Sequence, residues 1–380
     1  LEREIKALYD QYPEADMRPP LFGIPFGIKD IFHADGFETQ AGSKLPPEEL
    51  TGQEAESVSR LKDAGALAYA KTVTTEFAYF APGPTRNPHN PTHTPGGSSS
   101  GSAAAVGADM LPVALGTQTI GSIIRPAAFC GAVGFKPTYE RINSEGVIPL
   151  SVSVDHIGFF TRNSEDAEVV ASILVENWKP LTLPAKPRLG IPEGPYLENA
   201  SEEGLEHFEE LQSRLSKVGF DLVPISVMAN FEEIRERHNR IVAAEAAWTH
   251  RDWFRQYEDL YHPKTAELIR SGMKTSTQEL QAALLGREEL RSEMETAAEG
   301  AGIDLWISPS APGAAPSGLE STGDPVMNLP WTHSGLPSVS LPSGYNREGL
   351  PFGLQIVGSW YRDEEMLAWA KMLEKELRVE

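Results

Sequence analysis

Two clusters of glycine and serine, with one lysine far upstream of them, are the residues of this chain best suited to nucleophilic chemistry. The clusters run from Gly96 to Ser102 and from Gly116 to Ser122. Glycines that lead into a helix leave backbone N–H groups free, and such groups can cradle a phosphate or stabilise an oxyanion. A serine nucleophile needs a base, and lysine can replace histidine in that role.

Upstream of the clusters, Lys29 lies within the apolar segment 21–32, which predicts a buried strand. Lysine is seldom fully buried unless it is paired. On the local sequence alone, a lysine that reaches solvent or pairs with Asp30 is the simpler interpretation. Only partner residues supplied by other parts of the chain would favour a catalytic role.

Neither cluster fits a phosphate-binding motif. A P-loop requires a lysine and a Ser or Thr directly after its glycines, whereas Gly101 is followed by Ser102 and Ala103. The GxGxxG fingerprint of dinucleotide-binding folds is also absent from residues 94–138. A flexible linker is typical of glycine and serine runs, but this run continues directly into the alanine-rich segment 103–108, which predicts a helix.

Composition excludes several classes of partner. The chain of 380 residues carries 33 Lys and Arg against 54 Asp and Glu, a formal net charge of −21. This charge repels nucleic acids and anionic membranes, and no apolar run approaches the ~18 residues of a membrane helix. The single cysteine, Cys130, fits a reducing cytoplasmic location and is expected to serve packing. His89 and His93 lack a suitably placed third ligand, so no metal site is expected.

The elements around the clusters alternate between helix and strand, which predicts an α/β fold. Helices are expected over 1–12, 53–69, 103–108 and 363–377, and strands over 21–32, 66–71 and 111–115. A proline-rich bridge, 178–195, then leads to a charged, strongly helical region at 201–300.

The chain resembles the amidase signature family of serine hydrolases in three segments, IPFGIKDIF, TRNPHNPTHTPGGSSSGSAAAVG and ALGTQTIGSIIRPAAFCGAVGFKPT. Near the C-terminus, NLPWTHSGLPSVSLPSG and GLPFGLQIVG are similar to the closing strands of that family. The resemblance implies one domain over 1–380, with a mixed, mostly parallel central sheet sandwiched by helices. Residues 165–300, which no motif places, would form a variable helical layer or lid within it.

The resemblance also implies a Ser–cis-Ser–Lys triad that works through an acyl-enzyme without a cofactor. Ser122 would be the nucleophile, Ser98 the bridging serine after a cis peptide bond from Gly97, and Lys29 the base. Lysine accepts a proton only when neutral, so burial beside apolar residues must lower its pKa. The oxyanion hole would consist of the backbone N–H groups of Thr119, Ile120, Gly121 and Ser122.

Three positions bear on how well this chain fits the family pattern. Gln118 replaces an aspartate and Ile120 a glycine. A β-branched residue resists positive φ, so a loop that needs positive φ at 120 would be distorted, and a loop that does not would gain an apolar pocket wall. Arg125 lies three residues after the nucleophile instead of two, and either satisfies nearby carbonyls or binds the carboxylate of a small acidic amide. Thr117 and Gln118 are expected to lie next to the triad and support it without contacting the substrate, Thr117 by a hydrogen bond.

The leading prediction is a metal-independent hydrolase of linear amide C–N bonds that acts on a small carboxamide. Alternatives within the family are esters, carbamates, ureido acids and glutamine, the last as the glutamine-hydrolysing component of an aminoacyl-tRNA amidotransferase. A non-catalytic binding relative is the alternative from another class. Gln118 and Ile120 favour it, and intact Lys29, Ser98 and Ser122 argue against it. A homodimer is compatible with the sequence, which leaves the oligomeric state open.

Overall fold

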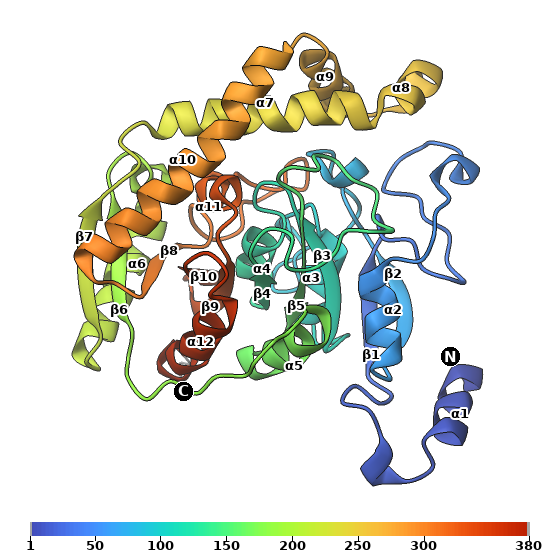
Figure 1. Ribbon diagram of the computed structural model, residues 1–380, viewed down its shortest axis with the longest axis horizontal. Helices are drawn as coiled ribbons and strands as arrows, with labels where there is room; N and C mark the ends of the chain where they lie inside the picture. The colour runs from blue at the N-terminus through green and yellow to red at the C-terminus, as the bar shows by residue number, and fades with distance from the viewer. Residues whose placement is uncertain (1, 378–380) are drawn as a thin grey trace.

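The computed structural model describes residues 2–377 and places their strands in one sheet with the order β2-β1-β3-β5-β4-β9-β10-β8-β6-β7 (Figure 1). The strands are β1 (Pro25–Lys29), β2 (Leu67–Thr72), β3 (Val113–Gln118), β4 (Val133–Lys136), β5 (His156–Thr161), β6 (Arg188–Glu193), β7 (Asp221–Ser226), β8 (Leu305–Pro309), β9 (Ser338–Tyr345) and β10 (Pro351–Val357).

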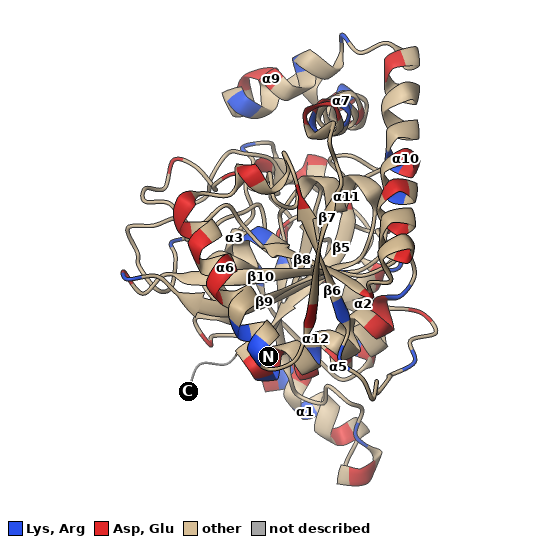
Figure 2. Cartoon of the chain, turned by 90° about the vertical axis from the view of Figure 1, so that its left-hand side faces the viewer, with Lys and Arg blue, Asp and Glu red and all other residues tan. Residues whose placement is uncertain are grey.

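Helices cover both faces of this sheet. They are α1 (Glu2–Gln11), α2 (Glu56–Asp63), α3 (Ser100–Gly107), α4 (Ile124–Cys130), α5 (Ser164–Leu174), α6 (Glu202–Lys217), α7 (Phe231–Thr249), α8 (Arg251–Tyr257), α9 (Pro263–Gly272), α10 (Thr277–Ala301), α11 (Leu329–Ser334) and α12 (Asp363–Leu377). Figure 2 shows α3 and α6 on one side of the sheet and α2, α5 and α12 on the other. The α/β class predicted from the sequence is therefore confirmed. None of the helices within residues 2–377 has the length and hydrophobicity needed to cross a membrane.

The sheet is mixed, as expected, but parallel pairs do not dominate it. Parallel pairing is confined to its two edges, where β1 pairs with β2 and β3, and β6 with β7 and β8. The pairs between these edges, from β3 through β5, β4, β9 and β10 to β8, are antiparallel. Two features produce this centre: β5 lies between β3 and β4, and a short turn joins β9 to β10. The expectation of a mostly parallel sheet was wrong in this respect.

The edge that contains β1 and β3 brings the first candidate site residues together. β1 is shorter than the predicted strand and ends at Lys29, whereas β3 extends beyond its predicted end to include Thr117 and Gln118. The two strands run parallel, with Ile28 opposite Leu115. Because the C-terminal ends of parallel strands lie at the same edge of a sheet, Lys29 lies close to Thr117.

Glycine allows the first serine cluster to approach this edge closely. A Cβ at Gly101, in the first turn of α3, would lie 2.3 Å from the backbone nitrogen of Val73. A Cβ at Gly116, within β3, would lie 2.7 Å from the ring of Phe160 and 3.0 Å from Ser99 Oγ. All three distances are shorter than a normal contact of a carbon atom, so larger residues would displace α3 and the segment that precedes it.

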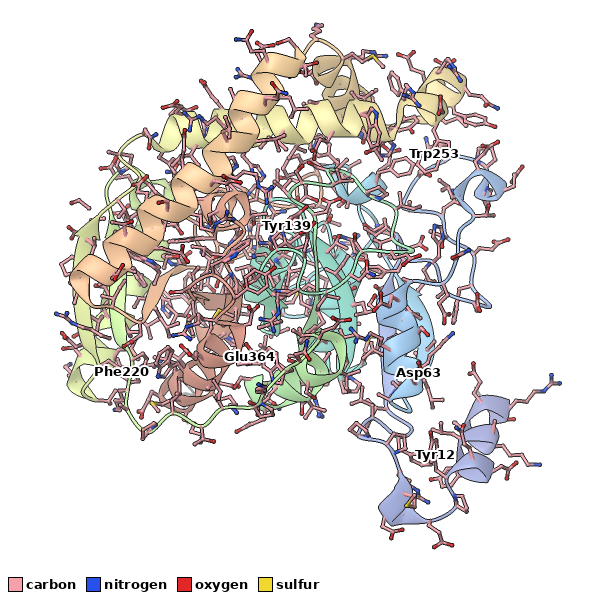
Figure 3. All side chains as sticks on the ribbon, in the orientation of Figure 1. Tyr12, Asp63, Tyr139, Phe220, Trp253 and Glu364 are labelled. Carbon is pink, nitrogen blue, oxygen red and sulfur yellow. The ribbon has the colours of Figure 1, made fainter. Side chains whose placement is uncertain are left out.

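Residues 165–300 contain more than helices. β6 and β7 lie within this range and extend the central sheet, and α6 packs beside them. The remaining helices, α7 to α10, form a layer across one end of the sheet (Figure 1). From this layer, Trp253 of α8 lies beside the segment that follows β2 (Figure 3) and stacks on Phe77 with ring centroids 6.0 Å apart. The layer therefore contacts a loop that leads toward the first serine cluster.

Candidate active site

Lys29 is fully buried at the end of β1, where two hydroxyl groups surround its amine. Lys29 Nζ donates to Ser98 Oγ and to Thr117 Oγ1, each at 2.7 Å. Burial lowers the pKa of Lys29 to about 7, and the nearby negative charge of Asp155 opposes that shift. A large fraction of this lysine is therefore neutral near pH 7, in the form that can accept a proton.

Ser98 follows a cis peptide bond from Gly97, as the resemblance implied. It is buried in the segment that leads into α3, and its carbonyl oxygen accepts a hydrogen bond from the backbone N–H of Thr75 at 3.1 Å. Its hydroxyl contacts the lysine amine directly. Ser98 can thus exchange a proton with Lys29 without a side-chain movement.

Ser122 lies in the loop 119–122 between β3 and α4, with 7 % of its surface exposed. Within residues 2–377 its hydroxyl makes no hydrogen bond, including none to Ser98. Catalytic hydrogen bonds are often long in the free enzyme and shorten only when substrate binds. Ser122 therefore has a hydroxyl without a competing partner among the described residues, within the loop that carries the predicted oxyanion hole.

The backbone N–H groups of this loop are unpaired. Within the described part of the chain, those of Thr119, Ile120, Gly121 and Ser122 donate to no acceptor. Unpaired N–H groups on consecutive residues can together stabilise a developing negative charge. The loop therefore has the properties of the predicted hole.

Ile120 fits into this loop without backbone strain. It is not among the non-glycine residues with positive φ, so the conformation that a β-branched residue resists is not required here. Its side chain lines a cavity of about 430 Å³. Other lining residues are Tyr79, Phe80, Val242, Lys264 and Glu267. The replacement of glycine by isoleucine therefore supplies an apolar wall.

The sequence profile of the Amidase family matches residues 2–367 of this chain. The chain belongs to the Amidase family. It is accordingly a hydrolase of amide C–N bonds. Within residues 2–377, no group of three or more His, Cys, Asp or Glu side chains is arranged to hold a metal ion.

Curated relatives of this amidase include glutamyl-tRNA(Gln) amidotransferase subunits from several bacteria. The protein from Synechococcus sp. is 32 % identical over 413 residues, which cover 93 % of this chain and 84 % of the relative. The protein from Thermus thermophilus is 30 % identical over 428 residues, which cover 97 % of this chain and 88 % of the relative.

Solved structures of amidases share the fold. A crystal structure of an amidase has a TM-score of 0.90 and 33 % identity, covering 99 % of this chain and 89 % of its own. The peptide amidase from Stenotrophomonas maltophilia has a TM-score of 0.82 and 25 % identity, and the match covers 99 % of this chain and 87 % of the peptide amidase. The fold class expected from the resemblance is thus confirmed by comparison.

Arg125 is buried and bonded to the protein. Its Nη1 donates to Gly323 O at 2.8 Å, and its Nη2 donates to Gly97 O at 2.6 Å and to Thr322 Oγ1 at 3.2 Å. Burial lowers the pKa of Arg125 to about 10, so the side chain remains charged at neutral pH. These contacts support the first of the two roles considered, in which the arginine satisfies carbonyls. They place it next to the peptide bond that precedes Ser98.

Thr117 and Gln118, the two residues expected to support the site, are hydrogen-bonded to Lys29 and to the start of α4, respectively. Thr117 Oγ1 accepts from Lys29, as described above. Gln118 Oε1 accepts from the backbone N–H groups of Ile123 and Ile124 at 2.8 and 2.9 Å, and its Nε2 donates to Thr332 Oγ1 at 2.9 Å. Gln118 therefore links the start of α4 to α11.

Sequence reasoning missed several residues that surround the site. Asp155 accepts from Thr119 Oγ1 at 2.6 Å and from two backbone N–H groups. Burial raises the pKa of Asp155 to about 6. Thr332 lies in a C-terminal segment that the resemblance included, so its position could have been suspected. His238 of α7, which hydrogen-bonds to Thr119 O, could not have been found from the sequence, since it lies in the helical region that no motif places.

Replacing Arg125 should affect stability before it affects specificity. We expect Arg125→Leu to lower the free energy of unfolding by about 2 kcal/mol or more, because it leaves buried carbonyl oxygens without a donor. Arg125→Lys should lower the free energy of unfolding by a smaller amount. Chemical denaturation measures both effects. In the fraction that remains folded, activity toward acidic and neutral amides should fall equally, and a rise of KM confined to acidic amides would contradict this assignment.

The pH dependence of labelling by a fluorophosphonate should report on Lys29. The rate should rise with pH to a plateau with a midpoint near 7, because only the neutral amine accepts the serine proton. Asp155 raises the pKa of Lys29, so Asp155→Asn should move the midpoint to lower pH. The two profiles are compared by intact-protein mass spectrometry. A parent midpoint near 10.5, the ordinary lysine value, or an unchanged midpoint in Asp155→Asn would contradict the expectation.

Proposed function

We propose that this amidase hydrolyses a small carboxamide through an acyl-enzyme on Ser122, with Ser98 as proton relay and Lys29 as base. The observation that carries the proposal is the buried amine of Lys29, whose pKa is lowered to about 7 and which lies 2.7 Å from Ser98 Oγ. Burial of a lysine disfavours its charged form, which suits a base and serves no evident structural purpose.

In the first step, Ser122 Oγ attacks the carbonyl carbon of the amide. Its proton passes to Ser98 Oγ while the proton of Ser98 passes to Lys29 Nζ. The carbonyl π electrons move to oxygen, and the unpaired N–H groups of loop 119–122 stabilise the resulting negative charge. When the tetrahedral intermediate collapses, the C–N bond breaks and the leaving amine takes a proton back from Lys29 through Ser98.

In the second step, water hydrolyses the acyl-enzyme. The same relay removes a proton from the attacking water, and collapse of the second intermediate returns a proton to Ser122 Oγ. The acid product and the free enzyme result. Lys29 thus alternates between base and acid, and a pKa close to the working pH allows both roles.

The cavity beside Ile120 is the proposed binding site for the rest of the substrate. Its walls combine apolar and aromatic side chains with two charged ones, Lys264 and Glu267 of α9. A volume of about 430 Å³ lies within the range of small-molecule sites. An amide with an apolar body and a polar end fits this lining. With Arg125 bonded to the protein, Lys264 is the cation available to an acidic substrate.

A second candidate is the hydrolysis of glutamine as one component of an amidotransferase. The observation that favours it is the match to a glutamyl-tRNA(Gln) amidotransferase subunit over 93 % of this chain. The net charge of −21 offers tRNA no attraction, so this role would require a partner protein to bind the nucleic acid. We also infer a cytoplasmic location from the lone, buried Cys130, which fits a reducing compartment.

Covalent labelling tests the assignment of Ser122 as the nucleophile. After incubation with a fluorophosphonate, the parent protein should carry one covalent adduct in its intact mass, and Ser122→Ala should carry none. Ser98→Ala and Lys29→Ala should be labelled at least 100-fold more slowly, since a general base contributes about 10²–10⁴ in rate. Ser100→Ala, in the same cluster, is the matched control and should label at the parent rate. An adduct that persists in Ser122→Ala would refute the assignment.

The second prediction separates the two candidate substrates. Ammonia release from the purified chain is measured with a panel of simple aliphatic and aromatic carboxamides and with glutamine, at equal concentrations. We expect at least one carboxamide with an apolar body to give the higher kcat/KM, because Phe80, Ile120 and Val242 give the mixed cavity lining an apolar part that can pack against such a body. A preference for glutamine over every member of the panel would favour the amidotransferase role instead.

A further inference from the structure

Two carbonyl groups of the loop 119–122 are held by side chains that lie outside both glycine-serine clusters. His238 Nε2, from α7, donates to Thr119 O at 3.1 Å. Thr332 Oγ1, from α11, donates to Ile120 O at 2.6 Å. Both side chains are fully buried. Neither residue contacts Lys29, Ser98 or Ser122 through a hydrogen bond within residues 2–377.

The geometry of the peptide unit turns these two contacts into a constraint on the N–H groups. In a trans peptide the C=O of one residue and the N–H of the next point in opposite directions. The one cis bond within the described residues is Gly97–Ser98, so both peptide bonds of Ile120 are trans. A fixed Thr119 C=O therefore fixes the Ile120 N–H, and a fixed Ile120 C=O fixes the Gly121 N–H, each on the opposite side.

We propose that His238 and Thr332 are positioning residues that orient the Ile120 and Gly121 N–H groups toward the oxyanion. The inference rests on the proposed function, because it assigns these donors to the oxyanion hole of Ser122. Preorganised donors stabilise the transition state without reorganising during the reaction, so a loop free to rotate would lose part of this stabilisation. Among the described residues no backbone N–H donates to Thr119 O or Ile120 O, so the side chains supply the donors.

The protonation state of His238 agrees with this role. The carbonyl of Thr119 can only accept, so Nε2 must carry the hydrogen. Burial lowers the pKa of His238 to about 3, and the ring is therefore neutral in the pH range of the reaction. Within residues 2–377 its Nδ1 has no hydrogen-bond partner. The histidine thus acts as a fixed neutral donor.

Thr332 belongs to a short chain of hydrogen bonds that ends in the loop. Gln118 Nε2 donates to Thr332 Oγ1, which in turn donates to Ile120 O. Gly121 must be small for α11 and its N-terminal residue to approach this closely. A Cβ there would lie 2.4 Å from Asn328 Oδ1 and 2.8 Å from Pro325 Cβ. The loop is therefore fixed from two helices at once, on the sides of Thr119 and of Ile120.

Paired variants test the hydrogen bonds separately from packing. The amide nitrogen of glutamine lies near the place of histidine Nε2, and that of asparagine near Nδ1, so His238→Gln should retain the bond and His238→Asn should lose it. Thr332→Ser should likewise retain the hydroxyl that Thr332→Val removes. We expect the plateau rate of fluorophosphonate labelling to fall at least 10-fold in His238→Asn and Thr332→Val and less than 3-fold in the other two.

The pH profile distinguishes a positioning role from general damage. Because Lys29 and Ser98 are untouched, the midpoint of labelling should stay at the parent value in all four variants while the plateau changes. His250→Leu and Thr138→Val are matched controls, since both side chains are buried and hydrogen-bond to residues outside the loop, Tyr261 and Asp363. The proposal would be overturned if the plateau rate of labelling fell as much in the controls as in His238→Asn and Thr332→Val. It would also be overturned if that rate were unchanged in those two variants.

Crystal structures of His238→Asn and Thr332→Val provide a readout that does not depend on activity. The Thr119–Ile120 peptide should rotate or become disordered in the first variant, and the Ile120–Gly121 peptide in the second. Unchanged orientation of both peptides would overturn the positioning role even if labelling fell. Failure of the proposed function is seen separately, as persistent labelling in Ser122→Ala.

Discussion

The burial of one lysine amine at the end of an interior strand is the constraint on which the rest of this site depends. Lys29 has no salt bridge within residues 2–377, and two hydroxyl groups are its hydrogen-bond partners. An unpaired charge in such surroundings is costly, so the amine is poised to be neutral. The arrangement requires three segments far apart in sequence to meet, and the parallel pairing of β1 with β3, together with the close approach of α3, brings them together.

The position of the loop 119–122 against α11 depends on the antiparallel centre of the sheet. β9 and β10 insert between β4 and β8, and α11, which directly precedes β9, lies against the loop that follows β3. Residues more than 200 positions apart thereby share hydrogen bonds, as Gln118 and Thr332 do. A wholly parallel sheet would require long crossover connections here in place of the short turn between β9 and β10. The departure from the expected topology is thus also what encloses the loop.

Local patterns were sufficient to predict the helices at both ends of the chain and the α/β alternation. The resemblance led from the serine clusters to Lys29 and to the cis bond before Ser98. The direction of the central strands could not be predicted, because strands buried on both faces are continuously apolar whether their neighbours are parallel or antiparallel. The contacts of Arg125 with Gly323 and Thr322, and the contact of His238 with Thr119, were equally hidden, since each spans more than 100 residues.

The replacement of the family's aspartate by Gln118 is compatible with catalysis on electrostatic grounds. A carboxylate at this position could accept from the N–H groups of Ile123 and Ile124 as Gln118 Oε1 does, but it could not donate to Thr332. It would also add a negative charge near the loop 119–122, the proposed site of the oxyanion, in a protein whose net charge is already −21. The neutral amide keeps the contacts at the start of α4, adds a donor that holds Thr332, and removes a repulsion that the transition state would otherwise have to overcome.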